Sequence, residues 1–548
     1  MQRTRAGRSL ALLVGASLLA CVFGPGAATA TESDVSFDPP QLILRGEAVT
    51  LQVGVPDEGD PTGVAYVRAG SSGRFTKLPM AWNSGHGRLV AKVPARLLAG
   101  SIVEEYVMVR FPATGRSVTV PPAGAAGPFR SRILDRPSTV KLARHRFGHL
   151  RSATTIAARA EPGSGPGEAG FACPAEGRCA EPASFDVEAD GTVWVADTAN
   201  HRLLVWEPGH AMRPSRTIPL DYTPLELAVA PDHTVYVRGV KPGVFPSRLF
   251  ALDRSGRQLW WSNLASDDLF THLRFGSGGV LYTVVVPWGP WTPVMDRDGA
   301  PLGIADQVAN VRSGQPIAGG RRLIVDARWV LPRGQLAPRD WRAAIATKSG
   351  KLRRAWRIRS LNDLDLSMAA VPTVVGGDPL LVFEVYRFSD HTMEHVVVRL
   401  SASGGIRDRF SLGRGGIRGG DVVTDVRVGG DGRLYQLLSD PAWGLEIAQY
   451  EVIGPSSPSA APSPSPTPAS VTPAPSPSPK PNPTRSSAVA SPVLSPSPTL
   501  GPSSPTSSGR SDEMWPAVGL GIMALLGALA AWRSWARRAR QPPGPRGT

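Results

Sequence analysis

The side chains that could do chemistry are most concentrated in the stretch FDVEADGTVWVADTANHRLLVWEPG, at residues 185–209. Asp197 and His201, with a serine from elsewhere, could supply the acid, base and nucleophile of an acyl-transfer triad. The sequence has no G-x-S-x-G segment, the turn that exposes the nucleophilic serine in α/β-hydrolases. We therefore expect a structural role for this polar cluster and predict no catalytic residue.

Two cysteines form a second candidate for chemistry. Cys173 and Cys179 lie in FACPAEGRCAE, a loop that also contains Pro and Gly. We predict a local disulfide between them, formed in an oxidising compartment. Zinc binding is the weaker alternative, because no histidine lies nearby to complete a ligand set.

A recurring phrase identifies the elements that must position the polar cluster. An Asp- or Gly-rich turn followed by a strand starts at residues 190, 232, 277, 319, 376 and 431. This spacing, about 42 to 57 residues, is typical of propeller blades. Each unit reads as four strands, and such a sheet is apolar on both faces and must stack against neighbours. We predict a six-bladed β-propeller over residues 150–453.

The two ends of this region complement each other. The sixth unit stops after LEIAQYEVI without a fourth strand, and RSATTIAARA at 151–160 precedes the first unit. We expect this early segment to supply the missing strand and to close the ring.

The segment DGTVWVADTANHRLLVW resembles the NHL repeat, a family of propeller blades with a G-x-hydrophobic-aromatic-V-x-D-x-x-N-x-R core. Asp197, Asn200, His201 and Arg202 fall on the motif positions. The resemblance implies that Asp197 and Arg202 pair and tie the second strand to the third. It covers one blade in full, since the other units lose the Asn-His-Arg, although Asp326 in LIVDARW echoes Asp197.

Some NHL-like propellers are enzymes, including lyases with a metal held by histidines near the ring axis. The resemblance therefore makes an extracellular lyase or hydrolase the alternative function. Here only His272 is expected to face the axis, with His233 in the adjoining turn. A metal site needs about three converging ligands, so we predict no metal and no other cofactor.

Long loops with aromatic residues follow the second strand of most units and emerge on one face of the ring. Aromatic and Arg-rich loops on a rigid scaffold favour a recognition surface. The alternative is that these side chains plug the mouth of the ring as local cores. The candidate ligand-binding residues on this face are Phe245, Trp288, Trp291, Trp329, Trp341, Tyr386 and Trp443.

The segments before the propeller predict export. Residues 1–30 have the basic start, apolar run and A-x-A end of a signal peptide. LLAC at 18–21 also resembles a lipobox, which leaves lipidation of Cys21 as an alternative. Residues 31–133 alternate short strand-like runs with turns, which favours an immunoglobulin-like β-sandwich.

The segments after the propeller predict a membrane anchor. Residues 454–511 are a Pro/Ser/Thr-rich stalk without the apolar residues of a core, and we expect it to be disordered. Residues 515–532 carry no charge and are long enough for one transmembrane helix. Residues 533–548 are basic and are expected in the cytoplasm.

These features together predict an all-β, single-pass cell-membrane protein with an extracellular N-terminal part. The excess of Arg over Lys suggests a GC-rich, actinobacterial source. Part of the net charge of +15 belongs to the two ends, and the location argues against nucleic acid as a partner. We expect binding or scaffolding of an extracellular protein, a peptide or a cell-wall glycan. A purely structural role, as an element that spans the cell wall, is a further hypothesis.

Overall fold

The computed structural model describes residues 35–452 except 38, 57–58, 85–86, 174–178, 242–246, 266–270, 286–288, 328–337, 361–365, 388–389, 391 and 417–422. The predicted signal peptide, stalk, transmembrane helix and cytoplasmic tail lie outside these residues. Within the described part of the chain, no helix has the length and apolar character needed to cross a membrane.

The N-terminal domain is predominantly β, as expected, and its described part also includes short 3-10 helices at Ala95–Leu97 and Gly124–Ala126. Strand β5 pairs with β4 through residues 76–80 and with β6 through residues 81–83, so one nine-stranded sheet folds over a single core. The immunoglobulin-like relationship stays a prediction. The strands are β1 (Ser36–Phe37), β2 (Leu42–Leu44), β3 (Val49–Gly54), β4 (Thr62–Ala69), β5 (Thr76–Asn83), β6 (Arg88–Val93), β7 (Ile102–Phe111), β8 (Arg116–Val120) and β9 (Phe129–Leu134).

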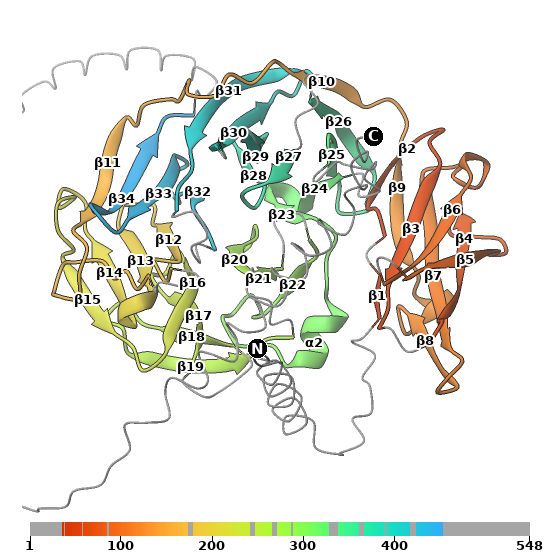
Figure 1. The fold of residues 1–548 in the computed structure, drawn as a ribbon, viewed down its shortest axis with the longest axis horizontal. Coiled ribbons are helices and arrows are strands. Elements are labelled where there is room, and N and C mark those ends of the chain that lie inside the picture. The colour runs from red at the N-terminus through yellow and green to blue at the C-terminus, as the bar shows by residue number, and fades with distance from the viewer. Residues whose placement is uncertain are drawn as a thin grey trace, which may run out of the picture. The chain divides into compact units, whose positions relative to one another are not determined.

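The central region is a six-bladed β-propeller, drawn in Figure 1 from yellow to blue. Blade 1 comprises β12 (Ser184–Val187), β13 (Val193–Asp197), β14 (Arg202–Trp206) and β15 (Arg216–Pro219). Blade 2 comprises β16 (Thr223–Val229), β17 (Val235–Val240), β18 (Arg248–Leu252) and β19 (Gln258–Asn263). Blade 3 contains β20 (His272–Phe275), β21 (Leu281–Val284) and β22 (Trp291–Pro293), followed by helix α2 (Ile304–Ala309).

The second half of the ring repeats this plan. Blade 4 comprises β23 (Gln315–Ile317), β24 (Arg321–Ala327), β25 (Asp340–Ala346) and β26 (Leu352–Ser360). Blade 5 comprises β27 (Leu366–Met368), β28 (Thr373–Val375), β29 (Asp378–Arg387), β30 (Thr392–Leu400) and β31 (Ile406–Gly413). Blade 6 contains β32 (Val426–Val428), β33 (Leu434–Asp440) and β34 (Gly444–Tyr450).

The ring closes through the segment that the sequence analysis identified. Strand β11 (Thr155–Ala160) pairs antiparallel with β34 and becomes the outer strand of blade 6. This confirms the expected exchange between the start and the end of the propeller. Strand β10 (Ser138–Leu142) adds a fifth strand to blade 4, in parallel with β26.

Stacking between blades explains why the strands are apolar on both faces. In β13, Val193 and Val195 pack in a cluster with blade 6, whereas Trp194 and Ala196 pack in a cluster with blade 2. All residues of this strand are buried. Alternating side chains of one strand thus serve two neighbouring cores.

Candidate ligand-binding site

The innermost strands of the blades surround a cavity of about 450 Å³ on the propeller axis. Its ionisable lining residues come from blades 1, 2, 3 and 6, and blade 5 contributes apolar side chains that include Val371, Leu380 and Val382. The lining includes residues 186–190, 229–231 and 233, so the cavity lies where the first-to-second strand turns leave the blades. Its ionisable lining residues are Asp186, Glu188, Asp190, His233, Arg274 and Arg427.

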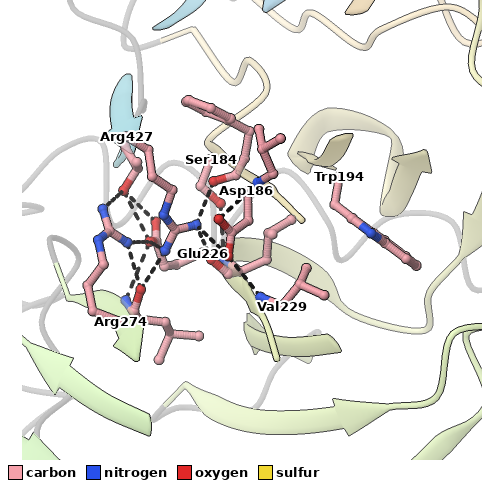
Figure 2. Close-up of polar contacts among 12 residues, drawn as sticks. Ser184, Asp186, Trp194, Glu226, Val229, Arg274 and Arg427 are labelled. Carbon is pink, nitrogen blue, oxygen red and sulfur yellow. Dashed lines mark hydrogen bonds and ion pairs between the residues drawn. The ribbon is translucent and has the colours of Figure 1, made fainter. Parts of the chain in front are cut away.

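Arg427 joins the inner strands of three other blades. Its guanidinium donates to the carbonyl oxygens of Phe185 at 2.6 Å, Leu227 at 2.9 Å and Leu273 at 2.7 Å. The same group lies 3.3 Å from the Asp186 carboxylate. Figure 2 shows it between Asp186 and Glu226. One side chain of blade 6 therefore binds the backbones of blades 1, 2 and 3.

Glu226 is the central acceptor of this network. It is fully buried and accepts a hydrogen bond from Arg274 Nη1 at 2.7 Å. Thr424 Oγ1 lies 3.0 Å and 3.1 Å from the two carboxylate oxygens, and 3.1 Å from His272 Nδ1. The buried carboxylate is thus matched by cations and a hydroxyl, which a buried charge requires.

Burial and like charge shift the pKa values of the basic members. Burial lowers the pKa of Arg274 to about 10, and the nearby Arg427 guanidinium acts in the same direction. Burial lowers the pKa of His272 well below its usual value, and Arg274, Arg238 and Arg427 add to this effect. At neutral pH the Arg274 guanidinium is therefore charged and the His272 imidazole is neutral.

The inner strands of blades 1 and 2 are also joined side by side. The Val229 amide donates to Asp186 Oδ2 at 2.9 Å, and the Leu227 amide donates to Ser184 Oγ at 3.1 Å. Ser184, Asp186 and Val229 are labelled in Figure 2. The cavity wall on this side is therefore held by side-chain-to-backbone bonds in addition to packing.

At the rim, Glu188 accepts a hydrogen bond from Trp194 Nε1 at 2.6 Å and contacts His233 Nδ1. His233 has a left-handed backbone with φ of 67°. Neither His233 nor His272 belongs to a metal-binding group, since the described residues contain no such cluster of three or more His, Cys, Asp or Glu.

The aromatic residues predicted to bind a ligand differ in their exposure to solvent. Trp291 in β22 is 2% exposed and packs edge-on against Tyr282. Trp341 in β25 is 0% exposed and its Nε1 donates to the Leu366 carbonyl at 3.0 Å. These two side chains are buried in hydrophobic cores and offer no surface to a ligand. Their burial agrees with the alternative in which the aromatic residues form local cores.

The other aromatic candidates divide between exposed and undescribed positions. Tyr386 is partly buried on β29, and Trp443 is 46% exposed in the turn between β33 and β34. Phe245, Trp288 and Trp329 lie outside the described residues. Trp443 follows the second strand of blade 6, whereas the turns that line the axial cavity follow first strands, so Trp443 and the cavity lie at opposite ends of the blades.

The motif residues of blade 1 form a compact polar clasp. Arg202 Nε donates to Asp197 Oδ2 at 2.7 Å, and the two residues face each other across β13 and β14. Asn200 donates to the same carboxylate at 2.9 Å. His201 takes a left-handed conformation with φ of 52°, and its Nδ1 lies 2.9 Å from Thr223 Oγ1.

This clasp also holds the chain that precedes the blade. The Gly170 amide donates to Asp197 at 2.9 Å, and Arg202 donates to the carbonyl oxygens of Ser164 and Glu168 at 3.0 Å and 2.7 Å.

Cys173 and Cys179 are disulfide-bonded, which confirms the predicted disulfide.

The cavity and its network were missed at the sequence level, although a signal exists. Asp186 in FDV, Glu226 in LEL, Arg274 in LRF and Arg427 in VRV are each a charged residue within an apolar inner strand. A strand with one face in solvent shows the same alternation of charged and apolar residues. Only the ring geometry distinguishes an axis-facing charge from a surface charge.

Comparisons with known proteins show similarity of fold alone. No protein-family model and no curated protein matches the chain. Virginiamycin B lyase from Staphylococcus aureus aligns with 49% of this chain and 94% of its own, at 11% identity and a TM-score of 0.26. A protein of unknown function from Bacteroides caccae aligns with 65% of this chain and 94% of its own, at 11% identity and a TM-score of 0.26.

A functionally unknown protein from Desulfotomaculum acetoxidans aligns with 50% of this chain and 85% of its own, at 12% identity and a TM-score of 0.31. At these identities and scores the alignments carry no argument about activity.

Proposed function

We propose that the chain is a cell-surface binding or scaffolding protein whose propeller holds an extracellular peptide or glycan in the axial cavity. The observation that carries the proposal is the cavity itself. At about 450 Å³ it falls within the size range of small-molecule sites, and it combines apolar walls with fixed polar groups. The disulfide fits an oxidising, extracytoplasmic compartment.

The network at the cavity supports binding over catalysis. Arg274 and Glu226 are paired with each other, and Arg427 already donates to three backbone carbonyls. Groups committed in this way keep the cavity in shape and are poorly placed to exchange protons with a substrate. An extracellular lyase or hydrolase remains the competing proposal, and product formation would identify it.

The test is to fill the cavity mouth. Ala189 is exposed and lines the cavity, so Ala189→Trp should occlude it without disturbing a core. Isothermal titration calorimetry with a panel of short peptides and disaccharides should show a ligand whose affinity falls at least tenfold in this variant. Ala113→Trp, at an exposed turn of the N-terminal domain, is the matched control and should bind like wild type.

Equal affinity of both tryptophan variants for the ligand would contradict binding in the cavity. Conversion of the ligand to products by the wild-type protein would replace the binding proposal with the enzymatic one.

A further inference from the structure

Blade 4 carries a group of cations on the face where its first-to-second turn leaves. Strand β24 begins there, beside the turn that connects β25 to the start of β26. None of these side chains forms an ion pair with a described residue. All are exposed except Arg322, which is partly buried. This blade-4 cation cluster consists of Arg321, Arg322, Lys348, Lys351, Arg353 and Arg354.

Three of its arginines share one hollow. Arg321, Arg353 and Arg354 line a space of about 570 Å³ together with Thr347. Consecutive residues of a regular strand point to opposite faces, so Arg353 and Arg354 would normally be separated. The register of β25 and β26 shifts beside them, since Ile345 faces Arg354 whereas Ala346 faces Leu352. This bulge lets both guanidinium groups serve the same hollow.

The neighbouring cations add to the positive field. Arg132 Nε donates to the Gly350 carbonyl at 3.1 Å, which places a further guanidinium against the turn. Burial lowers the pKa of Arg132, and repulsion from Arg322 and Arg130 lowers it further. Burial and the nearby Arg312 likewise lower the pKa of Arg322. Like charges held this close repel one another, and a bound anion would relieve the repulsion.

The chemistry of the cluster favours a particular anion. Planar guanidinium groups match phosphate oxygens with paired hydrogen bonds. Lys348 and Lys351 extend the positive surface beyond the lining of the hollow, so one small anion cannot neutralise the whole cluster. Residues 315–327 and 340–360 expose no large apolar side chain, which a surface inserting into a membrane would use.

We propose that the blade-4 cation cluster binds an extended phosphodiester polymer, as a site separate from the axial cavity. This proposal rests on the extracellular location given under the proposed function. The polymer's phosphates would enter the hollow at Arg321, Arg353 and Arg354. Its flanking phosphates would reach the lysines.

A synthetic poly(glycerol phosphate) is the probe, and fluorescence anisotropy of labelled polymer with the full chain is the measurement. The variant Arg321→Gln/Arg353→Gln/Arg354→Gln should bind at least tenfold more weakly, and wild-type affinity should fall as salt rises. The matched control Arg74→Gln/Arg96→Gln/Arg213→Gln removes the same charge from exposed positions elsewhere and should bind like wild type. Ala189→Trp should also leave polymer binding unchanged, which separates this site from the cavity.

Replacement of the same three arginines by lysine tests the role of the guanidinium fork, and we expect an intermediate loss. Equal losses in the cluster variant and the matched control would overturn the proposal, because net charge alone would then explain binding. The proposal would also be overturned by equally tight binding of hyaluronate, a carboxylate polymer, or by binding to anionic phosphatidylglycerol vesicles but not to the polymer.

Discussion

At the scale of single residues, Glu105 is a buried carboxyl whose protonation follows from its contacts. It is 1% exposed, and burial raises its pKa to about 8, although a hydrogen bond with Ser131 opposes the shift and Asp326 adds to it. Ser131 Oγ contacts both the Glu105 carboxyl and the Pro40 carbonyl, yet a hydroxyl has one proton to donate. Because Ser131 can donate to only one of these oxygens, its hydrogen bond cannot offset the burial that keeps Glu105 protonated.

This residue makes stability depend on pH. The folded chain keeps the proton up to about pH 8, whereas the unfolded chain loses it near the ordinary value of 4.5. Since the folded state binds more protons in this window, the free energy of unfolding falls as pH rises, by at most about 1.4 kcal/mol per pH unit. Urea unfolding from pH 5 to pH 8 should show a flatter dependence for Glu105→Gln. Exposed Glu161→Gln should keep the wild-type slope, and an unchanged slope in Glu105→Gln would refute the assignment.

At the scale of elements, closure of the ring depends on close approach of β11 to the start of β34. Gly444 has a φ of 99°, and a Cβ there would lie 2.1 Å from the Ala160 carbonyl oxygen. Gly444→Ala should therefore combine backbone strain with a clash between strands and destabilise the propeller by roughly 2–5 kcal/mol. Thermal unfolding measures this loss.

Gly432 in the same blade provides the control for Gly444. Its φ is 79°, and a Cβ there would have nothing within 4 Å. Gly432→Ala should cost only the strain, about 1–2 kcal/mol. Equal losses for the two variants would show that strand contact does not limit closure.

At the scale of elements, some features of the fold could be predicted from the sequence and others could not. The period of the turns, the disulfide and the closing segment 151–160 are local or periodic signals, and each corresponds to a feature of the fold. Burial of Trp291 and Trp341 was not readable, because it depends on neighbouring strands and side chains such as Tyr282 and Leu366. The axial network joins Glu226 to Thr424, which lie 198 positions apart in the sequence. No local sequence pattern could therefore predict this contact.

At the scale of the whole molecule, the N-terminal domain and blade 4 share a hydrophobic cluster. Leu42 and Leu44 of β2 pack with Ile324, Ala344 and Ala346, whereas Ile43 between them packs in the core of the N-terminal domain. The Leu42 amide donates to Asp326 at 2.9 Å, and Arg342 donates to the Leu42 carbonyl at 2.7 Å. Asp326 thus holds an incoming backbone segment, as Asp197 does in blade 1.

Sharing of side chains between two domains should make them unfold together. We expect one calorimetric transition for residues 35–452 of the wild-type chain, because exposure of β2 would open both cores. Leu44→Ala removes buried methyl groups from the shared cluster, at a cost of roughly 2–5 kcal/mol, and should split the transition in two. Ile43→Ala removes a similar volume from the N-terminal core alone and should lower the single transition without splitting it. If Ile43→Ala splits the transition and Leu44→Ala does not, the two domains are coupled through contacts other than this cluster.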